Sequence, residues 1–213
     1  SFMKRFTGHK EDWGTFIDVK ECVNPINIKR IQKKNVFLSS VTDCYNSFEE
    51  EYKVTRNILI QLVGVDCDLD ISTKSKLILR DLDLLKKMKN LKVSMSINTL
   101  DEDFRNDMDK ASSIKERLYT LEELHKNGIY TVLFISPIFP YITEWKEIIE
   151  KSKNYIDEYW FENLNLRGNY KFTILNYIKK KYADLYDKYI NIYDKKNKDY
   201  WINLSKDIEN YCE

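Results

Sequence analysis

The sequence predicts an α/β protein built on parallel strands. From Asn35 onward, short apolar and β-branched runs alternate with longer segments whose apolar residues recur every three or four positions. Repeated strand–helix units of this kind require crossover connections, which are right-handed between parallel strands. Periodicity alone leaves two architectures open: a closed or partial barrel, and an open doubly wound sheet.

The expected strands are short runs that end in polar residues or proline. The first is a buried apolar run, whereas the third alternates in polarity, and both patterns are typical of strands. Pro137 and Pro140 close the fourth. The five expected strands are Val36–Val41, Leu69–Thr73, Lys92–Ile97, Ile129–Ile135 and Ile156–Phe161.

Helices are expected between these strands. Acidic residues 49 to 51 suit a helix N-terminus, and Asn127-Gly128 is a typical helix end. The polar stretch Asp101–Ser113 carries no predicted element. Aromatic and apolar residues recur at helical spacing from Ile174 to Tyr193, so amphipathic helices are expected over about 170–213. The other expected helices are Phe48–Val63, Leu77–Met88, a segment from about 114 to 127, and Thr143–Asn154.

Composition favours one domain over residues 1–213, since 213 residues with 43% hydrophobic content can bury a sizeable core. Thirty-five Lys and Arg balance thirty-four Asp and Glu, which excludes the broad positive field of a nonspecific nucleic-acid coat. A local basic groove stays open, because lysines 179–181 lie among tyrosines; the explanation that we favour is a solvated lysine face behind a packed tyrosine face. The longest apolar run, near Tyr130–Ile138, is too short to span a membrane, so we expect a cytoplasmic protein without a membrane partner.

The four cysteines, Cys22, Cys44, Cys67 and Cys212, are scattered along the chain. Zinc and iron-sulfur sites usually need closely spaced ligands, which this pattern lacks. We therefore expect no metal ligands in these 213 residues and four reduced thiols.

Polar residues follow every expected strand. The carboxyl ends of parallel strands form the ligand-binding edge of such folds, so these residues are the candidate binding site. Lys74 offers a point charge to a carboxylate or phosphate, and Ser96 and Asn98 offer hydrogen-bond donors and acceptors. Helix caps and a surface lysine are the competing interpretations, and no catalytic residue is identified. The candidates are Ser40, Thr42, Asp43, Lys74, Ser96, Asn98, Ser136 and Asn163.

An ordered series of short motifs resembles one known family. It includes Phe6-Thr7-Gly8-His9-Lys10, Ser39-Ser40-Val41-Thr42-Asp43, Thr73-Lys74-Ser75, Ser94-Met95-Ser96-Ile97, Arg117-Leu118, Ile135-Ser136-Pro137 and Glu162-Asn163-Leu164-Asn165. The series is similar to spore photoproduct lyase-like radical S-adenosylmethionine (radical SAM) proteins. For His9, a cofactor contact and a purely structural role both stay open.

The resemblance implies a partial (β/α)6 TIM-like barrel that binds a [4Fe-4S] cluster and SAM. An electron donor reduces the cluster, and SAM is cleaved to a 5′-deoxyadenosyl radical that takes hydrogen from a substrate. The resemblance places Lys74 near the methionine end of SAM, with Ser96 one strand further on. It leaves the substrate open, with DNA repair of the lyase type suggested only by analogy.

The family's three cluster cysteines lie in a loop ahead of a segment like Ser1–Arg5, so the cluster ligands are not expected in this chain. The intact protein is then a radical SAM enzyme, and this chain alone is inactive. The alternative is a barrel without catalytic activity that binds a nucleotide or nucleic acid after loss of the cluster.

Overall fold

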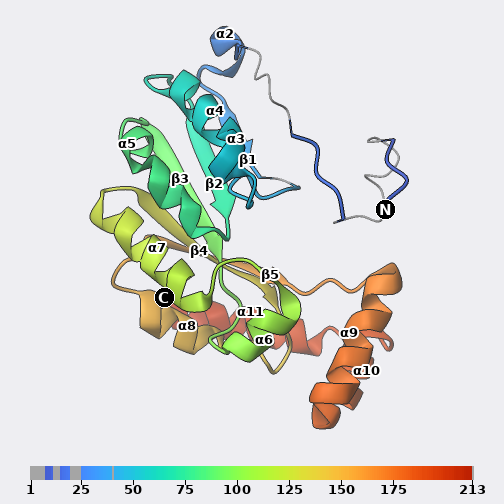
Figure 1. The fold of residues 1–213 in the computed structure, drawn as a ribbon. Coiled ribbons are helices and arrows are strands. Elements are labelled where there is room, and N and C mark those ends of the chain that lie inside the picture. Colours follow the sequence, from blue (N-terminus) through green and yellow to red (C-terminus); the bar gives the residue numbers. More distant parts are fainter. Residues whose placement is uncertain (1–7, 12–14, 20–24, 40, 213) are drawn as a thin grey trace.

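The computed structural model describes residues 8–11, 15–19, 25–39 and 41–212. Within them lies one sheet of five parallel strands in the order β1-β2-β3-β4-β5, which confirms the predicted α/β class (Figure 1). The strands are β1 (Asn35–Leu38), β2 (Asp68–Thr73), β3 (Asn90–Ser96), β4 (Tyr130–Ile138) and β5 (Glu158–Asn163).

Helices connect consecutive strands, and further helices follow the last strand. Those between strands are α3 (Glu49–Tyr52), α4 (Val54–Leu62), the 3₁₀ helix η1 (Lys76–Asp81), α5 (Leu82–Leu85), α6 (Glu102–Met108), α7 (Ile114–Lys126) and α8 (Trp145–Ser152). A short α2 (Ile28–Ile31) precedes β1. After β5 come α9 (Gly168–Lys181), η2 (Ala183–Leu185), α10 (Tyr186–Tyr193) and α11 (Asp199–Cys212). No helix of the described residues is both long and apolar enough to cross a membrane.

The two faces of the sheet differ in character. On one face Ile71, Val93 and Leu133 are fully buried in the main apolar core, to which α4, α7 and α8 contribute. The alternate residues, such as Asp70 and Lys92, which are paired between β2 and β3, keep part of their surface exposed. Successive side chains of a strand point to opposite faces, so one face makes the core and the other stays open.

Helix α7 is well defined by its sequence. Ser113 and Glu116 form a reciprocal capping box at its start, and Gly128 follows its end with a φ of 77°. Its buried side chains Ile114, Leu121 and Leu124 join the core. Arg117 lies on this same buried side, and that position matters for the candidate site.

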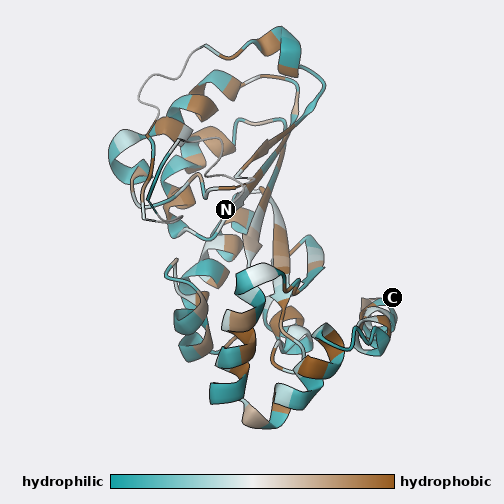
Figure 2. Cartoon of the chain, turned by 90° about the vertical axis from the view of Figure 1, so that its right-hand side faces the viewer, coloured by the Kyte–Doolittle hydropathy of each residue, from teal (hydrophilic) through white to brown (hydrophobic). Residues whose placement is uncertain are grey.

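The C-terminal helices form a second apolar cluster. Ile178 of α9 and Tyr189 of α10 are fully buried there, together with Phe104 of α6 and Phe139. Figure 1 shows α9 and α10 side by side, away from the strands, and Figure 2 shows hydrophobic and hydrophilic residues interspersed along these helices. Trp201 of α11 packs against both clusters. The expected C-terminal helices are therefore present, as three α-helices and one 3₁₀ turn.

Several expected boundaries were wrong. The helix expected over 48–63 is broken at Lys53, whose φ of 52° is left-handed and cannot continue a right-handed helix. The helix expected over 77–88 is the shorter α5 preceded by 3₁₀ turns. In the polar stretch after Asp101 the structure has α6, which apolar spacing missed because Phe104 is its one buried side chain.

Several strand boundaries also differ from the expected ones. β1 stops at Leu38 because Ser39 has a φ of 80°, outside the range of a strand. β4 continues through Pro137 to Ile138, and β5 runs from Glu158 to Asn163 rather than from Ile156 to Phe161. Ser136 and Asn163 thus belong to strands and do not follow them.

Candidate functional site at the carboxyl edge of the sheet

The loops after β1, β2 and α6 meet at the carboxyl edge of the sheet. They line a cavity of about 670 Å³ with Asp43, Ser75, Lys76 and Ser112, among others. Parallel strands end on the same side, so these loops come together despite their separation in the chain. This is the edge at which the sequence placed its candidate residues.

Asp43 joins the first two strand ends. Its Oδ1 accepts a hydrogen bond from Thr73 Oγ1 at 2.7 Å and one from the backbone N–H of Tyr45 at 2.9 Å. Its Oδ2 accepts the backbone N–H of Lys74 at 2.8 Å. Both carboxylate oxygens are therefore engaged in holding backbone and side chain at the end of β2.

The side chain of Lys74 reaches a second carboxylate. Lys74 Nζ donates to Asp109 Oδ2 at 3.3 Å, and the side chains are 39% and 25% exposed. Charge-assisted bonds are usually about 2.7–2.9 Å long, so this contact is a loose one. The Lys74 side chain therefore stays partly exposed, with a weakly held ammonium that can donate to a ligand.

Asp109 is bound far more tightly by Arg117. The guanidinium of Arg117 donates to Asp109 Oδ1 at 2.6 Å, and only 2% of the Arg117 side chain is exposed. Burial opposes ionisation of Asp109, but the charges of Arg117 and Lys74 outweigh it, so the pKa of the Asp109 carboxyl is lowered. Asp109 is therefore a carboxylate with one strong partner and one weak one.

Arg117 also fixes the end of β3. It donates to the carbonyl of Ser96 at 3.0 Å and to the carbonyl of Ser112 at 2.8 Å. One buried cation thus joins the last residue of β3, the loop before α7 and, through Asp109, the side chain of Lys74.

The remaining candidates form links between neighbouring strands. Asn98 Nδ2 donates to the carbonyl of Pro137 at 3.0 Å, and Ser136 Oγ donates to Glu162 Oε2. Asn163 is exposed at the end of β5. Together with Asp43 and Arg117, these bonds tie the carboxyl ends of all five strands into one edge.

Two candidates after β1 stand apart from this set. Thr42 is exposed and lines a smaller cavity of about 260 Å³ beside Asp43, Cys44 and Ile17. Ser40 lies outside the described residues, so its predicted approach to Lys74, Ser96 and Asn98 stays a prediction.

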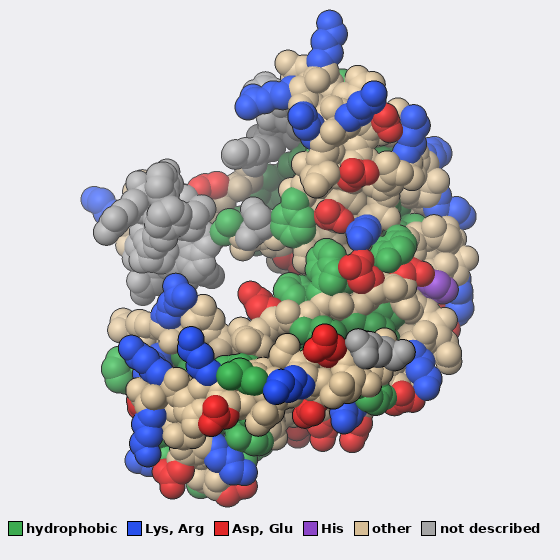
Figure 3. All heavy atoms as spheres, turned by 180° about the vertical axis from the view of Figure 1, so that it is seen from behind, with side chains coloured by type: hydrophobic (Ala, Val, Ile, Leu, Met, Phe, Trp, Pro, Cys, Tyr) green, Lys and Arg blue, Asp and Glu red, His purple; other side chains and the backbone are tan. Residues whose placement is uncertain are grey.

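The open face of the sheet carries a second group of aromatic and charged side chains. Lys92 Nζ lies 2.8 Å from Glu158 Oε2 and 5.0 Å from the centre of the Tyr130 ring. On the same face, Phe134 and Trp160 pack edge to face with ring centres 5.9 Å apart. Figure 3 shows a hollow on this side, in which hydrophobic, acidic and basic side chains lie close together. This face therefore offers aromatic and charged surface beside the candidate edge.

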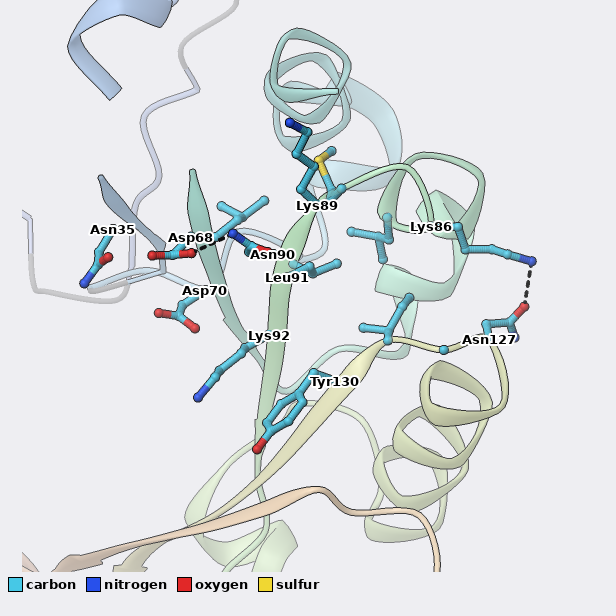
Figure 4. Close-up of a pocket in the computed structure, with 15 residues that line it drawn as sticks. Asn35, Asp68, Asp70, Lys86, Lys89, Asn90, Leu91, Lys92, Asn127 and Tyr130 are labelled. Atoms are coloured by element: carbon cyan, nitrogen blue, oxygen red, sulfur yellow. Dashed lines mark hydrogen bonds between the residues drawn. The ribbon is translucent and has the colours of Figure 1, made fainter. Parts of the chain in front are cut away.

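A further cavity of about 550 Å³ lies at the opposite, amino edge (Figure 4). Asp68 and Asn90 are hydrogen-bonded there at 3.0 Å, and Lys86 reaches Asn127 at 3.2 Å across the turns. None of the predicted site residues lines it. Since ligands of parallel α/β folds bind at the carboxyl edge, we assign the candidate site to that edge.

The described cysteines do not form a metal site. Cys44, Cys67 and Cys212 are free and lie on separate elements, and no group of three metal-ligating side chains occurs among the described residues. Burial raises the pKa of the Cys44 thiol to about 11, which disfavours the thiolate that binds metal. A [4Fe-4S] cluster does not fit the described residues; Cys22 lies outside them.

His9 is engaged with acidic neighbours. Its Nε2 lies 2.9 Å from the Asp18 carboxylate, and its ring stacks on Phe16 with ring centres 3.8 Å apart. The hydrogen bond to Asp18 raises the pKa of the imidazole. These contacts give His9 a local partner without linking it to the carboxyl edge.

Sequence reasoning missed Asp109 and Arg117 as members of the edge, whereas Glu162 was recognised as a strand-end residue beside Asn163. A signal for Arg117 existed, because it falls on the apolar stripe formed by Ile114, Leu118 and Leu121 at helical spacing. A charged residue in such a stripe needs a buried partner. Asp109 carries no comparable signal, since it lies in a polar loop whose path depends on α6.

Comparison with known proteins shows the family to which the chain belongs. The family model of the radical SAM superfamily matches residues 5–152, more than half of the chain. The chain therefore belongs to the radical SAM superfamily, whose members use SAM.

Two relatives and one solved structure illustrate the relationship. The chain is 35% identical over 176 residues to the uncharacterised protein MJ0683 of Methanocaldococcus jannaschii, covering 82% of this chain and 67% of that protein. It is 31% identical over 134 residues to the uncharacterised protein ORF301 of Acidianus two-tailed virus, covering 60% of this chain and 44% of that protein.

The structure is similar to a spore photoproduct lyase variant with bound SAM and dinucleoside spore photoproduct. The TM-score is 0.55 at 13% identity, over 75% of this chain and 58% of the lyase chain. This likeness supports the partial-barrel fold. The chain spans between about two fifths and two thirds of the proteins it matches.

Proposed function

We propose that this chain is the SAM-binding barrel body of a radical SAM enzyme, with SAM at the carboxyl edge of the sheet. The supporting observation is the arrangement around Lys74, which combines a fixed backbone with a partly exposed side chain whose ammonium is only loosely paired. An ammonium in this position suits the carboxylate of the methionine end of SAM.

The other strand-end groups complete a polar donor set. Ser96 lies at the end of β3, and Asn98 and Ser136 lie beside the next strand ends. Hydroxyl and amide groups suit the amino and ribose groups of SAM. We propose Thr42, Asp43 and Asn163 as outer members of the site, with Asp43 acting through its hold on Lys74.

In radical SAM enzymes a [4Fe-4S] cluster supplies the electron that cleaves SAM homolytically. The described residues offer no ligand set for it. This chain's own contribution is then to bind and orient SAM and to enclose the substrate. An external electron donor and a cytoplasmic location belong to the same proposal, the latter supported by the free thiols.

For the substrate we propose the open face of the sheet as the adjoining space. Lys92, Glu158, Phe134 and Trp160 give it both charged and aromatic contacts. A nucleic-acid lyase reaction is one candidate, because the similar lyase structure contains a dinucleoside product. A barrel that binds a nucleotide without radical chemistry is the second candidate, favoured by the dispersed cysteines.

The coding sequence upstream of Ser1 and SAM binding test these alternatives. A cysteine triplet upstream, and SAM binding by the anaerobically reconstituted full-length gene product in calorimetry, are expected for the enzyme. Absence of the triplet together with absence of SAM binding would overturn the enzyme proposal and favour the binding protein.

A further inference from the structure

Asp109 occupies the place that a ligand's carboxylate would take beside Lys74. It presents Oδ2 to the ammonium at 3.3 Å, while its Oδ1 is bound by Arg117 at 2.6 Å and by the backbone N–H of Ala111 at 3.0 Å. The carboxylate is thus anchored from one side and meets Lys74 from the other.

These two contacts differ in how readily they can be broken. Arg117 is almost completely buried, so breaking its bond to Asp109 would leave an unpaired charge inside the protein, which is costly. The Lys74 contact is long and the Lys74 side chain is more than a third exposed, so water or a ligand can replace this contact with little loss. If Lys74 turns to a ligand, Asp109 still has Arg117 as its counterion.

The net charge of this group also indicates that the Lys74 contact can be exchanged for a ligand. Lys74, Asp109 and Arg117 together carry one net positive charge, which one ligand carboxylate would neutralise. Because Asp109 is fixed next to that carboxylate's expected position, it repels the incoming group. Asp109 therefore weakens binding of the ligand's carboxylate, and in the ligand-free protein it keeps the ammonium of Lys74 in place.

We propose that Asp109 is a specificity-determining residue that acts as an internal competitor for Lys74. In the free protein Asp109 is paired with the ammonium of Lys74, and on binding the carboxylate of the ligand replaces Asp109 as its partner. The strength of the Asp109 contact therefore determines how much the ligand's carboxylate contributes to affinity. This inference rests on the proposed binding of SAM at the carboxyl edge.

The test is SAM binding by calorimetry on the reconstituted full-length gene product, comparing wild type with Asp109→Asn and Asp109→Glu. The Asn variant removes the competing charge, so SAM should bind about three- to tenfold more tightly. The Glu variant keeps a charge for Arg117 and brings the carboxylate closer to Lys74, so SAM should bind severalfold more weakly. The Glu variant also provides a result if loss of the charge prevents the Asn variant from folding.

Decarboxylated SAM is the matched probe, because it lacks the group that competes with Asp109. It keeps the ammonium and the sulfonium, which a carboxylate attracts, so it should bind no more tightly to the Asn variant and no more weakly to the Glu variant. Glu122→Gln is the matched control, since Glu122 forms an exposed ion pair with Lys126 at 2.9 Å on the same helix as Arg117 and lines no part of the cavity at the carboxyl edge. It should leave SAM affinity unchanged.

The outcomes separate the two proposals. Wild-type protein that carries its cluster and binds no SAM overturns the proposed function, and this inference with it. Wild-type protein that binds SAM, with unchanged affinity in both Asp109 variants or an equal effect on decarboxylated SAM, overturns the role of Asp109 alone. Opposite shifts in the Asn and Glu variants, seen only with SAM, support it.

Discussion

Asp43 Oδ2 accepts the backbone N–H of Lys74 at 2.8 Å, which joins the loop after β1 to the end of β2. Oδ1 of the same carboxylate accepts the hydroxyl of Thr73. The two residues are thirty-one positions apart in the chain. Lys74 follows β2, but its backbone is held in place by Asp43, which follows β1.

Replacing Asp43 should affect stability as well as binding. Asp43→Ala removes three hydrogen bonds at a partly buried position, so the free energy of unfolding should fall by about 1–3 kcal/mol. Urea denaturation measures this change. Thr42→Val, at the exposed neighbouring position, should be close to wild type, and equal losses in both variants would contradict the role given to Asp43.

Asp81 should be one of the most sensitive positions. Its fully buried carboxylate accepts from Arg56 at 2.7 Å, from Arg80 at 2.8 Å and from the Tyr45 hydroxyl at 3.1 Å. Asp81→Asn leaves both guanidinium groups without this charge, so the free energy of unfolding should fall by about 3–5 kcal/mol.

The matched control is Asp83→Asn, which removes an exposed partner of Arg56. It should cost only about 0–1 kcal/mol. Burial opposes ionisation of Asp81, but its bonds to Arg80 and Arg56 lower its pKa in the folded state. The stabilisation is present above the unfolded pKa, near 4, and is lost as pH falls through the folded value. Acid unfolding that is unchanged in Asp81→Asn would contradict this assignment.

Cys44 should be the less reactive of two thiols that can be compared directly. Burial raises its pKa to about 11, whereas Cys212 is exposed near the end of α11. At pH 8 iodoacetamide should therefore label Cys212 well before Cys44, as followed by peptide mass spectrometry. Because the folded pKa lies above the unfolded value of 9, stability should decrease as pH rises from about 9 to 11. Faster labelling of Cys44 would show that its thiol is accessible and ionised.

The 213-residue chain produced alone should assemble no stable cluster. The described cysteines lie on separate elements and offer no site with three ligands. Anaerobic reconstitution followed by iron and sulfide analysis checks this. Stoichiometric iron that survives gel filtration, and is lost when Cys22, Cys44 or Cys67 is replaced, would show that the prediction is wrong.

Much of the fold could be predicted from the sequence, because strand and helix periodicities report directly on burial. The five strands and α7 were found in this way. The helix break at Lys53 could not be predicted in this way, because a glycine indicates a left-handed backbone conformation in the sequence and a lysine does not. The extent of one domain over 1–213 stays a prediction.

The candidate site was predictable only in part. The edge itself follows from parallel topology, and Lys74 and Ser96 were found because they end strands. The partner of Lys74 was not, because Asp109 is brought there by α6 and α7, thirty-five positions away. Polar partnerships across loops depend on tertiary structure, which local patterns do not encode.

The most direct test of the proposed function is SAM binding to the anaerobically reconstituted full-length gene product, wild type against Lys74→Met, measured by calorimetry. Methionine keeps the unbranched stem of the side chain and removes the charge. A charge-assisted bond of about 1.5–3 kcal/mol would be lost, so SAM affinity should fall by roughly 10- to 100-fold while the unfolding transition stays close to wild type. Equal SAM affinity in a folded, cluster-loaded Lys74→Met variant would contradict the placement of the SAM carboxylate at this edge.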